Sequence, residues 1–98
     1  MTEARDLVGQ GEISRGIASA ESAKRFAPGD TEIQDFIDEN LRQLNRTLKS
    51  LYTESVLEER FGNIEAAKGK WETILKMDVP GGEYQGRAQN KLKQYGGR

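Results

Sequence analysis

The sequence predicts an all-α protein made of paired helices, and three observations support this. Apolar residues recur at three- and four-residue steps along most of the 98 residues, which is the spacing of one helix face. No segment has the period-two alternation that is typical of a half-buried strand. The two prolines, Pro28 and Pro80, fall where apolar stripes end, as expected for residues that stop helices.

The first two helices are predicted to be short. Residues 3–8 form one behind Thr2, and the glycines of residues 9–11 end it. The next helix follows Gly11 and stops at residues 28–30. Its apolar face consists of Ile13, Ile17, Ala20, Ala23 and Ala27.

A long third helix is predicted over residues 31–60, because this stretch contains no glycine and no proline. Asp30 or Thr31 can cap its start, and at 1.5 Å per residue it would be about 45 Å long. Its apolar stripe consists of Ile33, Ile37, Leu41, Leu44, Leu48, Leu51 and Ser55.

Two further helices follow a break at residues 61–63, where Gly62 can take the left-handed conformation and Asn63 can cap the next helix. The fourth helix should end near Asp78, and residues 79–82 form a turn. The apolar faces consist of Ile64, Ala67, Trp71, Ile74 and Leu75 in the fourth helix and of Tyr84, Ala88, Leu92 and Tyr95 in the fifth. Trp71 is predicted to lie in the core rather than to be an exposed binding residue.

Composition and charge indicate one small domain over residues 1–98 without catalytic equipment. The chain contains no His and no Cys, and these are the commonest general bases, nucleophiles and metal ligands. We therefore expect no enzyme activity, no catalytic residue, no cofactor and no metal. A net charge of −1 and the absence of a long apolar run or leader predict no nucleic acid partner, no membrane insertion and a cytoplasmic location.

Two stretches of the chain follow the same pattern. After Gly11, Gly16, Ala20, Ala23 and Pro28 stand at offsets of 5, 9, 12 and 17. After Gly62, Ala67, Trp71 and Ile74 stand at the first three offsets and Pro80 at 18. This pattern resembles the second helix of a tetratricopeptide repeat (TPR), in which a small residue lets two helices approach and proline ends the second. The glycines of residues 9–16 are better explained this way than as a phosphate-binding loop.

The resemblance covers one fair repeat at about residues 48–80 and one truncated repeat at about residues 1–29. It implies an α-solenoid of helical hairpins that is a fragment, or the end, of a longer array. Leu51, Ser55 and Leu57 stand where the family has large, small and large residues. The two turn glycines are 51 residues apart rather than the usual 34 or so, and we assign the excess to residues 31–47, in front of the second repeat's first helix.

By resemblance, the expected function is protein–protein interaction, with the chain acting as a scaffold that binds a protein or peptide on a concave face. The partner-binding residues implied in the better repeat are Lys49, Tyr52, Val56 and Glu59. The Lys and Asn that the family uses to clamp chaperone tails are absent from positions 52 and 56, so such tails are not expected to bind. The alternative is a homodimer formed through the long helix, whose stripe from Ile37 to Ser55 alternates gaps of four and three.

Overall fold

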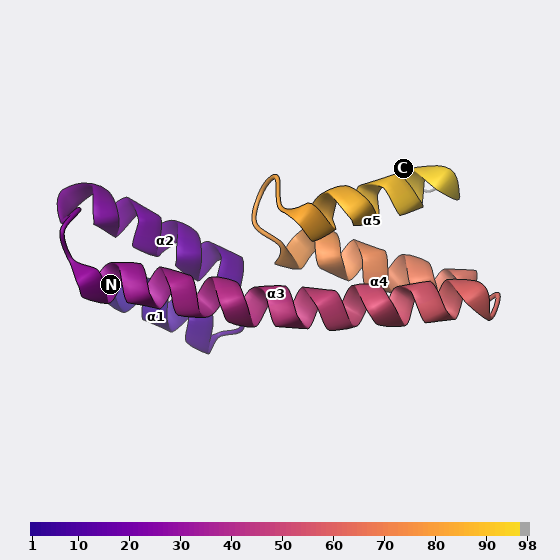
Figure 1. Cartoon of the computed structure of the whole chain (residues 1–98), viewed down its shortest axis with the longest axis horizontal. Helices are drawn as coiled ribbons and strands as arrows, with labels where there is room; N and C mark the ends of the chain where they lie inside the picture. The colour runs from indigo at the N-terminus through magenta and orange to yellow at the C-terminus, as the bar shows by residue number, and fades with distance from the viewer. Residues whose placement is uncertain (97–98) are drawn as a thin grey trace. The chain divides into compact units, whose positions relative to one another are not determined.

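The computed structural model describes residues 1–96, and in this part of the chain all regular structure is helical (Figure 1). The prediction of an all-α fold with one long helix is confirmed. The five helices are α1 (Thr2–Gly9), α2 (Ile13–Phe26), α3 (Thr31–Arg60), α4 (Ile64–Met77) and α5 (Glu83–Gln94).

The chain divides into two compact units, Met1–Asn45 and Arg46–Arg98. Unit 1 holds α1, α2 and the first half of α3, whereas unit 2 holds the second half of α3, α4 and α5. Each unit thus contains a short-turn helical hairpin and one further helical segment.

Unit 1 is built on the α1–α2 hairpin, whose helices lie side by side (Figure 1). Its α3 segment starts at a cap, because the Asp30 carboxylate accepts hydrogen bonds from the backbone N–H groups of Glu32 (2.9 Å) and Ile33 (3.4 Å). An ion pair between Arg5 and Glu32 joins α1 to α3. The buried apolar residues of this unit are Ala4, Ile17, Ala20, Ile33, Ile37 and Leu44.

The turns of the two hairpins share one geometry. Gly11 and Gly62 have φ angles of +83° and +81°, in the left-handed region that favours glycine. One residue later, the N–H of Glu12 bonds to the carbonyl of Leu7 (2.9 Å), as the N–H of Asn63 does to that of Glu58 (2.8 Å). The helices that follow, α2 and α4, each have 14 residues. Asn63 occupies the predicted cap position of α4, but its side chain makes no capping hydrogen bond.

A close helix approach occurs in unit 1 at Gly16, which is buried. A Cβ atom at this position would lie 2.6 Å from Cγ2 of Val8 and 2.9 Å from the carbonyl oxygen of Ala4. The lack of a side chain therefore sets the separation of α1 and α2. Ala67 holds the corresponding place in α4 and is fully buried, which agrees with the small residue that the sequence pattern requires.

The core of unit 2 lies among α3, α4 and α5. Its buried residues are Leu48, Ser55, Ala67, Trp71, Ile74, Ala88 and Leu92. Trp71 is fully buried, so its predicted place in the core is confirmed. Leu57, which stands where the family has a large residue, is 46% exposed. It is two positions beyond the buried Ser55 and so points well away from the core on a helix.

Asp78 organises the connection between α4 and α5. Its buried carboxylate accepts hydrogen bonds from the N–H groups of Val79 (2.8 Å) and Gln85 (2.9 Å). A Cβ atom on Gly82 would collide with this carboxylate, at 2.3 Å from one of its oxygens. The predicted turn is therefore a specific structure that fixes where α5 begins.

The extra residues between the two turn glycines lie in α3. Residues 31–47, which we assigned to the front of the second repeat's first helix, form the first part of this helix. Residues 31–45 belong to unit 1, where Ile33, Ile37 and Leu44 are buried. One long helix thus supplies the third helical segment of unit 1 and the first of unit 2.

Gly16→Ala should destabilise the chain by about 1–3 kcal/mol, because the new methyl group overpacks the contact with α1. Gly69, on an exposed side of α4, has no atom within 4 Å of a built Cβ and provides the matched control. Gly69→Ala should stabilise by about 1 kcal/mol through helix propensity alone. Urea titration measures both, and a neutral or stabilising Gly16→Ala would contradict the close approach.

Candidate functional site

The candidate site is built around Trp71 of α4, whose side chain contacts α3 and the residue that follows α5. Its indole Nε1 donates a hydrogen bond of 2.8 Å to Oγ of Ser55 on α3. That hydroxyl in turn donates to the backbone carbonyl of Tyr52, at 2.6 Å. On the other side, the Trp71 ring stacks on Tyr95, just after α5, with centroids 5.7 Å apart and an angle of 17°. A buried indole N–H needs an acceptor, so these contacts fix α4 against its neighbours.

A charged cluster joins α3 to α5 next to this stack. The Glu59 carboxylate accepts hydrogen bonds from Nζ of Lys91, at 2.8 Å, and from the hydroxyl of Tyr95. The hydrogen bond from Lys91, followed by that from Tyr95, lowers the pKa of Glu59 below its ordinary value. The same hydrogen bonds to Glu59 raise the pKa of Lys91 and of Tyr95. Both partners of the ion pair are shielded, with 15% of the Glu59 and 24% of the Lys91 side chain exposed.

An aromatic pair and an arginine lie further along the same two helices. The rings of Tyr52 and Tyr84 are 6.0 Å apart at 54°, a tilted arrangement that aromatic pairs favour. The guanidinium of Arg87 is 5.6 Å from the Tyr52 centroid and 5.3 Å from that of Tyr84, close enough for cation–π attraction to both. Arg87 also forms an ion pair with Glu83, at 2.7 Å. The two residues are four positions apart in the sequence, a spacing that favours such pairs on a helix. Both rings remain partly exposed.

The four predicted partner-binding residues occupy different environments. Tyr52 and Glu59 contact side chains of α5, as described above, and Val56 between them is half-buried. Lys49 is exposed and makes no ion pair with any residue in the described part of the chain. We call the surface formed by these residues of α3 with Tyr84, Arg87 and Lys91 of α5 the α3–α5 face.

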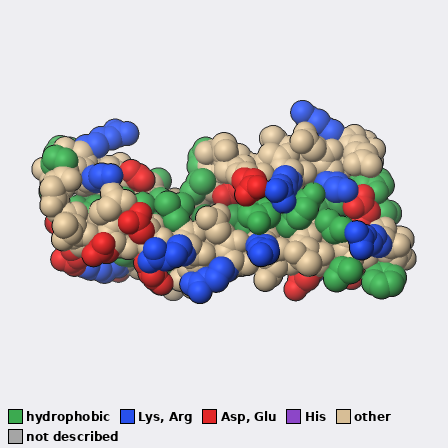
Figure 2. All heavy atoms as spheres, viewed as in Figure 1, with side chains coloured by type: hydrophobic (Ala, Val, Ile, Leu, Met, Phe, Trp, Pro, Cys, Tyr) green, Lys and Arg blue, Asp and Glu red, His purple; other side chains and the backbone are tan. Residues whose placement is uncertain are grey.

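Reasoning from the sequence missed the α5 contribution to this face. The sequence pattern places Tyr84 only on the apolar face of the last helix and predicts no role for Arg87 or Lys91. The Glu83–Arg87 spacing was a signal, but nothing local indicates that Arg87 also reaches a tyrosine on another helix. The space-filling view shows Lys and Arg side chains next to apolar ones on the visible side of unit 2 (Figure 2).

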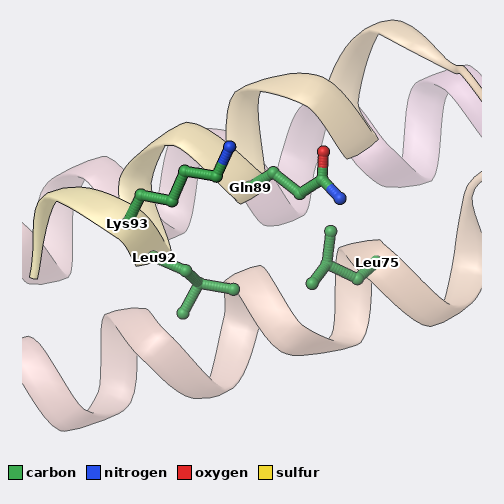
Figure 3. Close-up of a pocket in the computed structure, with 4 residues that line it drawn as sticks. All are labelled: Leu75, Gln89, Leu92 and Lys93. Atoms are coloured by element: carbon green, nitrogen blue, oxygen red, sulfur yellow. The ribbon is translucent and has the colours of Figure 1, made fainter. Parts of the chain in front are cut away.

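Two surface hollows in the described part of the chain are poor small-molecule sites. The one between α4 and α5 has a volume of about 100 Å³, well below the roughly 300–1,000 Å³ of ligand pockets. In Figure 3, Leu75 of α4 and Leu92 of α5 face each other there, with Gln89 and Lys93 alongside. A second hollow, of about 290 Å³, lies over the α1–α2 hairpin and is wide open to solvent. Among residues 1–96, no group of three or more acidic side chains is placed to hold a metal ion.

Within the described helices, none is both long enough and apolar enough to cross a membrane. Comparison of the chain with family models, with curated proteins and with solved structures gives no match.

Glu59→Gln should destabilise the chain at neutral pH by about 1–2 kcal/mol, the typical contribution of a hydrogen bond to a charged group. The pKa of Glu59 is lowered in the folded state from its ordinary value of 4.5. The contribution of Glu59 to folding stability is therefore complete above pH 4.5 and is lost as the pH falls through the lowered pKa. The pKa of Lys91 is raised, so its contribution is complete below 10.5 and is lost at higher pH.

The measurement is urea titration of both proteins from pH 3 to pH 8. The difference in unfolding free energy should be constant near neutrality and shrink at the acidic end. A difference that does not change with pH would mean that the ion pair contributes nothing to stability.

Proposed function

We propose that this chain is a non-catalytic protein-interaction module of tetratricopeptide-like helical hairpins, which binds a peptide or protein segment on the α3–α5 face. The observation that carries the proposal is the half-exposed pair Tyr52 and Tyr84 with Arg87 over both rings. Lys49, a cation with no ion-pair partner in the described chain, is exposed on the same helix as Tyr52.

The likeness to tetratricopeptide hairpins rests on features that both units share. Each has a left-handed glycine at the turn and a 14-residue second helix. Each also has a small buried residue, Gly16 or Ala67, at the same distance from that glycine. In stacked hairpins of this kind the first helix of each pair lines a surface for partners.

The chemistry of the α3–α5 face suits protein recognition. Tyrosine and arginine are enriched at interfaces, because they offer much contact area together with polar groups. Here Ser55 holds the Tyr52 backbone carbonyl, and the ring of Tyr52 lies against Tyr84 and Arg87. Since these side chains are already ordered, binding would cost less conformational entropy than it would on a mobile surface.

The alternative of a homodimer through the α3 stripe has less support. Ile37, Leu44, Leu48 and Ser55 are each at most 2% exposed within the single chain. A coiled-coil seam would have to remove these residues from their present packing. We therefore keep the interaction module as the proposed function.

Lys49→Glu combined with Tyr52→Ala should weaken binding of a peptide ligand at least tenfold, about 1.4 kcal/mol or more, because the variant removes an interface aromatic and reverses a rim charge. The ligand would come from a display library of random 12-residue peptides selected on the wild-type chain. Isothermal calorimetry with the best selected peptide gives the affinities.

Lys76→Glu is the matched control, since Lys76 is an exposed cation on α4 away from this face. It should leave the affinity unchanged, and circular dichroism should show the same helix content in all three proteins. Selected peptides that bind the double variant as tightly as wild type would place the interaction elsewhere and overturn the proposal.

A further inference from the structure

The outer side of α3 in unit 2 exposes two large apolar side chains next to each other. Leu57 is 46% and Phe61 77% exposed. Phe61 follows the last residue of α3, but its N–H still bonds to the Leu57 carbonyl at 3.1 Å, so the two keep the i,i+4 relation of helix neighbours. Single exposed apolar residues are ordinary, whereas an adjacent pair forms a small apolar patch that a partner can cover.

Unit 1 shows that the hairpin does not require apolar residues at these two places. When Gly11 is aligned with Gly62, Asp6 corresponds to Leu57 and Gln10 to Phe61. Asp6 and Gln10 are both exposed, and the N–H of Gln10 bonds to the Asp6 carbonyl at 3.0 Å, just as Phe61 bonds to Leu57. Leu57 and Phe61 are therefore not needed to close the turn.

Four more exposed residues share this side of α3. Steps of three and four residues place them on one helix face, about 22 Å long at 1.5 Å per residue. Its two arginines make no ion pair with any residue in the described part of the chain. The acidic residue at its edge, Glu54, is paired with Lys70 of α4 at 3.4 Å. We call this face the outer strip, and it consists of Arg46, Ser50, Thr53, Leu57, Arg60 and Phe61.

We propose that the outer strip docks an acidic amphipathic helix of a partner protein. The strip has the helical period of a helix-on-helix contact, and its apolar pair can receive the partner's apolar side chains. The partner's Asp or Glu residues would pair with Arg46 and Arg60. A second copy of this chain is a worse occupant, since strips packed on each other bring arginines towards arginines, and like charges oppose association.

The apolar pair of the outer strip lies on another side of α3 than Tyr52, and Lys49 lies between the two sides. Leu57 is five residues from Tyr52, which at about 3.6 residues per turn puts them about 140° apart around the helix. The proposal therefore does not depend on the proposed function, and each can fail alone.

The test uses two synthetic 18-residue helical peptides that carry leucine at three- and four-residue steps. One has glutamate beside the leucines, and the other has lysine at the same positions. Each is titrated onto the ¹⁵N-labelled chain and followed by amide chemical shifts. The glutamate peptide should shift the amides of Leu57, Arg60 and Phe61 and bind at least about tenfold tighter than the lysine peptide.

Two variants make the result specific. Leu57→Asp with Phe61→Gln installs the residues that unit 1 has in the same places, so the fold should persist while affinity falls about tenfold or more. Arg60→Glu should weaken binding of the glutamate peptide and strengthen binding of the lysine peptide. If the first variant unfolds, this second variant still tests the proposal. The single variant Tyr52→Ala should bind the glutamate peptide as wild type does.

Three results would overturn the proposal. The first is an absence of shifts on the outer strip at millimolar glutamate peptide, and the second is equal affinity for both peptides. The third is concentration-dependent self-association of the chain, seen by sedimentation and abolished by Leu57→Asp with Phe61→Gln. That outcome would assign the strip to a second copy instead.

Discussion

The burial of Trp71 is the interaction on which the rest of unit 2 depends. A small helical unit has room for few large side chains, and this one is fully buried. Its N–H bonds to Ser55 on α3, and its ring stacks on Tyr95 at the end of α5. A single side chain on α4 thus contacts both neighbouring helical segments, and its burial contributes both apolar area and a satisfied hydrogen bond. Unit 1 has Ala20 at the corresponding place. The two units therefore have the same turn geometry, but only unit 2 has a buried tryptophan in its second helix.

The candidate site follows from that anchor. With Tyr95 held against Trp71, Glu59 reaches both Tyr95 and Lys91, and α5 lies where Tyr84 and Arg87 meet Tyr52. Asp78 fixes the other end of α5 through the N–H of Gln85. The α3–α5 face is therefore ordered by the core beneath it, which is what a preorganised binding surface requires. The outer strip, by contrast, needs only the helix itself.

Most of the fold could be predicted because its signals are local. The absence of Gly and Pro marks the extent of α3, Gly11 and Gly62 mark the turns, and the apolar period identifies Trp71 as core. The site was predictable only in part, because it depends on which helix faces meet. Glu59 and Lys91 are 32 residues apart, and neither the period nor the spacing of charges shows that they pair. The family register gives Leu57 only as a large residue, and the three-dimensional arrangement shows that it is exposed.

The most direct test of this account is acrylamide quenching of the fluorescence of Trp71, the single tryptophan in the chain. Because Trp71 is fully buried, acrylamide should quench the native protein only weakly, and quenching should rise to the level of free tryptophan amide when urea unfolds the chain. The loss of protection should coincide with the loss of helix measured by circular dichroism. Strong quenching of the native protein, close to that of the free amide, would show that Trp71 is exposed and would contradict the arrangement of α3, α4 and α5 described above.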